Sequence, residues 1–129
     1  MLINQKLLDS LSAQAKASPR LRMNFDLRNT PDDQSQRMLN ALEPGTVMPI
    51  HRHPNTSETV VVLCGKVKWL YYDDQGNLTE TILVEADGDI RGLCVPKGQW
   101  HTIECLESGS VILETKDGAW EAMKEEDIM

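Results

Sequence analysis

The 129-residue sequence is poor in several features, and each shortage argues against a class of protein. Positive charge is scarce: 13 Lys and Arg residues stand against 20 Asp and Glu residues, which gives a net charge of −7. Surfaces that bind nucleic acids or anionic membranes are basic, so we expect neither partner. No apolar run is long enough to span a bilayer, and the residues after Met1 do not resemble a signal peptide. These absences predict a cytoplasmic protein.

Cysteine is also scarce. Only Cys64, Cys94 and Cys105 occur, and no pair of them forms a CxxC motif. This excludes a zinc ribbon and a thioredoxin-like redox motif. Each cysteine lies in an apolar, strand-like stretch, so we expect three reduced thiols in the core.

The hydrophobic pattern predicts one domain, residues 1–129, that is all-β apart from a short N-terminal α-helix. Residues 4–17 have apolar side chains at helical spacing, with Asn4 as the N-cap and Pro19 just past the end. A β-barrel or sandwich is predicted over 20–116, because short strands alternate closely with Gly, Pro, Asp and Asn turns. The predicted strands are 20–28, 36–42, 58–63, 66–72, 78–85, 90–95, 101–106 and 110–116, together with the segment around the first two histidines. For the acidic tail, 117–129, the sequence leaves a frayed helix or a cap as alternatives.

All three histidines fall into one spacing pattern. His51 and His53 alternate in a segment that reads as a strand, so their side chains share a face. The loop 54–57 would let the next strand return antiparallel and bring Glu58 opposite them. His101 follows a Pro-Lys-Gly turn and supplies a third imidazole. The set suits a divalent transition metal, and an incidental HxH pair is the weaker alternative.

These residues carry a resemblance to the cupin superfamily. The first cupin motif is matched by Gly45, His51, His53, Glu58 and Gly65, and the second by Pro96-Lys97-Gly98 and His101, with Ile90 and Cys105 in place of the usual Gly and Asn. Nearly the whole chain resembles the small WbuC-like cupins associated with bacterial O-antigen gene clusters, on segments 20–25, 37–45 and 96–102. The resemblance implies a cupin double-stranded β-helix (jelly-roll) barrel whose metal ion is held by three histidines and a glutamate.

Three neutral imidazoles and one carboxylate leave two positions of an octahedron open for a ligand. Fe, Mn, Ni, Co and Zn all suit this arrangement, and the sequence does not choose among them. If Glu58 leaves the metal, three histidines and a water form a tetrahedral zinc site, and Glu58 becomes a catalytic general base. Because coordinating imidazoles must be neutral, we expect metal to be lost below about pH 6.

Strand alternation predicts a mostly apolar small-molecule pocket beside the metal. Trp69 turns inward in the same scheme. A cysteine or tyrosine here is more often a core residue than a functional one. The predicted lining is Val60, Val62, Tyr71, Ile103 and Cys105.

The first strand carries Arg20, Arg22 and Arg28 on its polar face. Such a face is usually solvated, but arginines in a row also clamp a phosphate or a carboxylate. Arg22 is therefore added to the candidate pocket. Arg52 and Trp100 point away from the ligands and are expected to make packing or dimer contacts.

Two functions follow from the sequence. One is a metal-dependent enzyme, an isomerase, epimerase or oxygenase, acting on a small polar metabolite related to sugars or the O-antigen. The other is a non-catalytic cupin that binds or senses a small ligand through its metal. A homodimer is expected in either case, because pairing covers exposed sheet edges.

Overall fold

The computed structural model describes residues 1–129 as one helix, eight strands and a short 3-10 turn. Four strands have the predicted bounds, and the ends of the other four shift by no more than two residues. The elements are α1 (Gln5–Ala17), β1 (Arg22–Asp26), β2 (Gln36–Leu42), β3 (Glu58–Cys64), β4 (Lys66–Tyr72), β5 (Leu78–Glu85), β6 (Gly92–Val95), β7 (Trp100–Cys105), β8 (Ser110–Lys116) and η1 (Glu125–Asp127).

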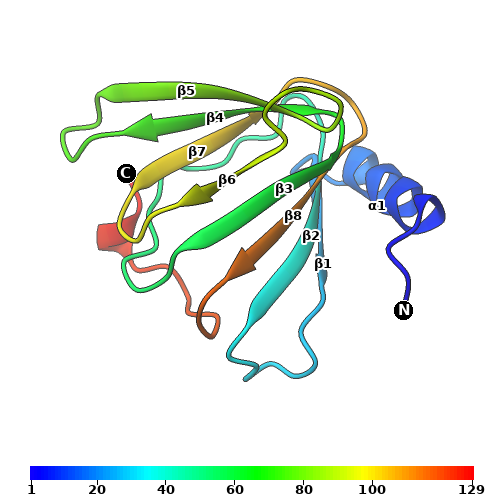
Figure 1. Ribbon diagram of the computed structural model, residues 1–129, viewed down its shortest axis with the longest axis horizontal. Helices are drawn as coiled ribbons and strands as arrows, with labels where there is room; N and C mark the ends of the chain where they lie inside the picture. The colour runs from blue at the N-terminus through cyan, green and yellow to red at the C-terminus, as the bar shows by residue number, and fades with distance from the viewer.

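The strands form two antiparallel sheets that face each other (Figure 1). The larger sheet has the order β1-β2-β8-β3-β6, and the smaller has the order β5-β4-β7. Apolar side chains from both sheets form the core between them, with Trp69 and Ile112 among the most deeply buried. This arrangement confirms the predicted all-β jelly roll with a short N-terminal helix.

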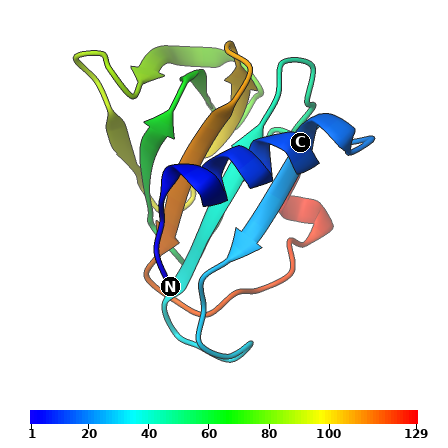
Figure 2. The ribbon, with the colours of Figure 1, turned by 90° about the vertical axis from the view of Figure 1, so that its right-hand side faces the viewer.

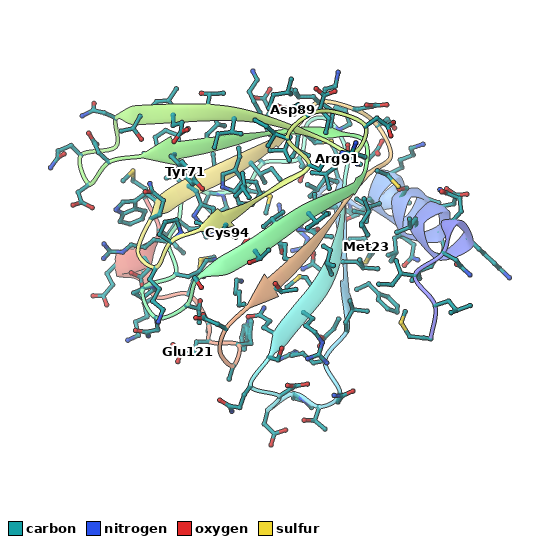
Figure 3. The ribbon with its side chains drawn as sticks, viewed as in Figure 1. Met23, Tyr71, Asp89, Arg91, Cys94 and Glu121 are labelled. Atoms are coloured by element: carbon teal, nitrogen blue, oxygen red, sulfur yellow. The ribbon has the colours of Figure 1, made fainter.

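Helix α1 covers the outer face of the larger sheet (Figure 2). Its N-terminus is capped as predicted, because the side chain of Asn4 accepts a 3.0 Å hydrogen bond from the backbone N–H of Leu7. Leu11 and Ala15 pack against apolar residues of β2 and β8. Met23 of β1, labelled in Figure 3, belongs to the same cluster. Since side chains alternate along a strand, the intervening residues of these strands face the interior.

The interior face of the larger sheet changes from apolar to polar along β8. Ile112, opposite Val62 of β3, lies in the core. Two and four residues further along, Glu114 and Lys116 occupy the same face, and Lys116 lies opposite Glu58. The barrel is therefore filled with apolar side chains at one end and opens into a polar cavity at the other.

The predicted strand around His51 and His53 is wrong. Only His51 is paired, in isolated bridges with His101 and Ile128. Pro49 and Pro54 bracket the segment, and a proline cannot donate to a strand ladder, so the pairing stops there. Glu58 consequently pairs with β6 and β8 and not with the histidine segment.

The first strand ends two residues earlier than predicted, and it begins two residues later because of Leu21. This residue has a φ of 56°, in the left-handed region, and the extended conformation begins only after it.

The acidic tail crosses the molecule as an ordered cap, shown in red in Figure 1. At its start, the carboxylate of Asp117 accepts a 2.8 Å hydrogen bond from the backbone N–H of Ser57. At its end, the N–H of Met129 donates to the carbonyl of Ile50 at 2.8 Å. The tail therefore closes over the segment that carries the first two histidines. No helix in the structure has the length and apolar character that crossing a membrane requires.

Candidate metal centre

The three histidines lie together although they come from different parts of the chain. Their ligating atoms are all within 4.8 Å of one another. His51 and His101 are fixed to each other by two backbone hydrogen bonds of 3.0 and 2.9 Å, and their ring centroids are 4.4 Å apart. The ring of His53 lies 5.0 Å from that of His51 and 5.7 Å from that of His101. The predicted histidine cluster is thus confirmed as a group able to hold a metal ion.

Backbone carbonyls set the tautomer of two of these imidazoles. Nδ1 of His51 lies 2.8 Å from the carbonyl of Pro49, and Nδ1 of His101 lies 2.9 Å from the carbonyl of Gln99. A carbonyl oxygen only accepts, so each Nδ1 carries the hydrogen and each Nε2 keeps its lone pair. Metal-binding histidines are commonly oriented in this way.

Burial keeps the imidazoles neutral. It is the main reason that the pKa of His53 and the pKa of His101 each fall to about 3, with neighbouring positive charge as a smaller contribution. Burial also lowers the pKa of His51, although the hydrogen bond to the Pro49 carbonyl acts in the opposite direction. Three neutral imidazoles whose free nitrogens converge suit a divalent transition metal ion.

Glu58 lies beside this cluster but outside the group of three. Its side chain is buried, with Oε2 3.5 Å from Nε2 of His53 and 3.8 Å from Nζ of Lys116. Burial, reinforced by the nearby carboxyl group of Glu114, raises the pKa of Glu58 to about 8, while Lys116 acts in the opposite direction. In the absence of a metal ion the carboxyl group is therefore largely protonated at neutral pH.

Two charged residues that lie near the centre, Lys116 and Glu114, were not identified from the sequence. Lys116 contributes positive charge that disfavours protonation of all three histidines. The pKa of Glu114 is raised, mainly by burial. Their spacing could have revealed them, because both are an even number of residues from Ile112, a core residue of β8, and therefore lie on the same face of the strand. Recognising it required knowing which face of β8 points inward.

The cavity around the centre has a volume of about 540 Å³. Only eight of its 28 lining residues are hydrophobic, whereas the sequence suggested a mostly apolar pocket. Of the six predicted pocket residues, Ile103 and Arg22 line it. The other four contribute to the hydrophobic core or pack against it: Val60, Val62, Cys105 and Tyr71.

The arginines of the first strand are divided by the fold. Arg20 and Arg22 line the cavity, with Trp69 of the opposite sheet. Arg28 lies elsewhere and pairs with Asp26 at 2.8 Å.

Arg52 and Trp100 contact each other within the chain. The guanidinium carbon of Arg52 lies 4.6 Å from the Trp100 ring centroid. Nε of Arg52 also donates to the buried carboxylate of Asp127 at 2.8 Å. These contacts match the packing role expected for the pair and fix the tail to the histidine segment.

Two buried polar atoms of residues that line the cavity lack a hydrogen-bond partner, Nε1 of Trp69 and Oδ1 of Asn40. The ring of Trp69 stacks on that of His101, with centroids 5.5 Å apart and an angle of 14° between the planes. An unpaired buried polar group costs about 1–3 kcal/mol, so both atoms are suited to meeting a polar ligand.

Comparisons with known proteins identify the family of the chain. Residues 3–84 match the family described as a domain of unknown function, DUF6016. No curated protein matches the chain.

Several solved structures share its fold. The capsular polysaccharide assembling protein CapF from Staphylococcus aureus superposes with a TM-score of 0.69 at 21% identity, over 87% of this chain and 32% of CapF. KdgF from Halomonas sp. gives 0.63 at 16% identity, over 81% and 84% of the two chains. The E162A mutant of Bacillus subtilis oxalate decarboxylase OxdC gives 0.58 at 23% identity, over 76% and 25%. This chain thus spans about a third of CapF and a quarter of OxdC. These likenesses establish the cupin fold.

Proposed function

This chain belongs to the DUF6016 family and has the cupin fold. We propose that it is a metalloprotein that binds a divalent transition metal through His51, His53 and His101. Glu58 is proposed as the fourth ligand. The observation that carries the proposal is the convergence of three neutral imidazoles, two of them with Nδ1 held by a backbone carbonyl. Iron, zinc, nickel, manganese and cobalt all remain compatible with this donor set.

We propose that the protein is an enzyme acting on a small polar metabolite. When bound, the metal would supply a Lewis acid that polarises a ligand oxygen. The chain itself supplies groups able to hold or move a proton: Glu58, Glu114 and Lys116, all lining the same cavity. The ring of Trp69 stacks on that of His101, and its buried N–H has no hydrogen-bond partner within the chain. This concentration of ionisable groups favours catalysis over a purely structural metal.

The metabolite class that we propose is sugar-related. The support is the resemblance to WbuC-like cupins associated with O-antigen gene clusters and the polar lining of the cavity. CapF is itself named for capsular polysaccharide assembly, but at 21% identity it is evidence for the fold alone. A cytoplasmic homodimer is proposed as the form in which the protein acts. The alternative, a binder or sensor without catalysis, would show ligand binding but no turnover.

Elemental analysis of the purified protein tests the metal centre. We expect about one divalent ion per chain, lost in His101→Ala and retained in Glu104→Ala, since Glu104 lies on the same strand but is exposed. Absence of metal from the unmodified protein, even after anaerobic reconstitution with Fe(II) and with Zn(II), would refute the proposal. Turnover of a candidate sugar that disappears in both His51→Ala and Glu58→Ala would establish catalysis.

A further inference from the structure

The cavity wall formed by β1 and the residues just before it carries two arginines that are not paired with a carboxylate. Arg20 and Arg22 line the cavity, and neither guanidinium has a carboxylate oxygen within 4.0 Å. The guanidinium groups of Arg28, Arg37 and Arg52, by contrast, each contact an aspartate.

The two arginines of this wall are close enough to repel each other. Burial and the charge of Arg20 both lower the pKa of Arg22. One N–H of Arg22 donates to the carbonyl of Val47 at 2.8 Å, and the structure gives it no other hydrogen bond. A guanidinium has five N–H donors, so most of its donor capacity remains available to a ligand.

The neighbouring strand adds a buried acceptor. Arg22 pairs with Leu42 and Asn24 pairs with Asn40, so Asn40 is the diagonal neighbour of Arg22 on the interior face. Asn40 is 3% exposed, and its Oδ1 has no hydrogen-bond partner. This oxygen requires a donor, which a hydroxyl group of a ligand would provide.

We propose that Arg20, Arg22 and Asn40 form a subsite for the anionic end of a small hydroxylated molecule. The anionic group is an oxyanion, a carboxylate or a phosphate, because the guanidinium fork matches the geometry of both. A hydroxyl group next to it donates to Asn40. The rest of the molecule extends through the shared cavity toward the histidines, and this last element alone rests on the proposed function. The ligand class is therefore a sugar acid or a sugar phosphate.

Calorimetric titration of the metal-loaded full chain tests the subsite with three probes: glucuronate, glucose 6-phosphate and glucose. At least one anionic probe is expected to bind at least about tenfold more tightly than neutral glucose, since hydrogen bonds to charged groups are the stronger ones. Whichever anion binds more tightly identifies carboxylate or phosphate as the preferred group.

Variants of two arginines localise the effect. Arg22→Ala is expected to weaken binding of the anionic probe by about tenfold or more and to leave the metal content unchanged. Arg28→Ala is the matched control, because Arg28 is paired outside the cavity, and it should change neither quantity. Arg22→Lys, which keeps the charge but loses the fork, should fall between them and serves if the alanine variant does not fold.

The subsite is refuted if neither anion binds more tightly than glucose, or if the Arg22 and Arg28 variants behave alike. Metal content measured on the same samples separates this result from the metal centre. If the protein cannot hold metal but binds an anion through Arg22, the subsite is supported and the proposed function is refuted. If the protein holds metal fully but shows no preference for an anion, the metal centre is supported and the subsite is refuted.

Discussion

The pH dependence of metal affinity tests whether Glu58 is a ligand. In the metal-free protein its pKa is raised to about 8, whereas the pKa values of His53 and His101 are lowered to about 3. Near neutral pH the carboxyl group is therefore protonated and these imidazoles are not. A metal ion that coordinates the carboxylate must displace one proton, so its affinity should fall tenfold for each pH unit below about 8.

The expected magnitude is large. Between about pH 8 and about pH 5 the affinity should fall about a thousandfold, which corresponds to about 4 kcal/mol of binding free energy. If only the histidines coordinate, the affinity should depend much less on pH over this interval, because burial lowers the pKa of each of them. The sequence-based expectation is metal loss below about pH 6, controlled by the histidines. If Glu58 coordinates, its raised pKa predicts a decline that begins near pH 8.

Competition with a chromophoric chelator measures this dependence, and Zn(II) is a suitable ion. Glu58→Gln should abolish the slope, and Glu114→Gln should retain it, since Glu114 is a neighbouring carboxyl group that is not proposed as a ligand. Proton release can be measured independently by calorimetry in two buffers of different ionisation enthalpy. A flat profile in the unmodified protein, or a slope that survives Glu58→Gln, would refute the role of Glu58 in coordination.

Other predictions concern stability and the tail. Gly65→Ala should destabilise the protein by about 2–4 kcal/mol in denaturant titration, because φ is +82° and a Cβ would clash with Oγ of Ser110. Gly109→Ala, with open space around it, should cost only about 1 kcal/mol. The unfolding free energy of the metal-free protein should be highest near about pH 6.5. Its alkaline decline arises because Glu58 and Glu114 have raised folded-state pKa values, so their stabilising contribution is lost as pH rises, for Glu58 toward about 8. Glu58→Gln should therefore reduce this decline. The acid decline comes from the histidines, whose lowered folded-state pKa values remove stability as pH falls below about 6.5. Asp127→Ala should weaken metal binding by about threefold to tenfold, because it removes the ion pair that fixes the tail to Arg52; unchanged metal affinity would show that the tail does not position the centre.

Much of the fold was predictable because local patterns determine it. Strands such as Lys66–Tyr72 alternate strictly and are bounded by turn residues, so their ends follow from the sequence. The histidine spacing was equally informative, although the strand inferred from it does not exist. His51 and His53 converge because the backbone of His51 pairs with that of His101, a contact fifty residues distant in the chain.

The rest of the site depends on register between distant strands. Lys116 meets Glu58 only because β8 inserts between β2 and β3. Asn40 is buried for the same reason, since β1 and β8 flank its strand on both sides, and its side-chain oxygen is left without a hydrogen-bond partner. No local periodicity encodes these pairings, so the polar character of the cavity could not be inferred from single strands.

The insertion of β8 also has a consequence for the order of folding. The last strand of the chain is a central strand of the larger sheet, and its partners, β2 and β3, precede it by several tens of residues. Contacts of such long sequence separation form slowly, because loop-closure entropy is lost before the pairing stabilises the chain. The histidine segment is then secured by residues 127–129, which follow β8. Tight metal binding should therefore be acquired only at the end of folding, so the metal would report on the completed native state and would contribute little to the nucleation of folding.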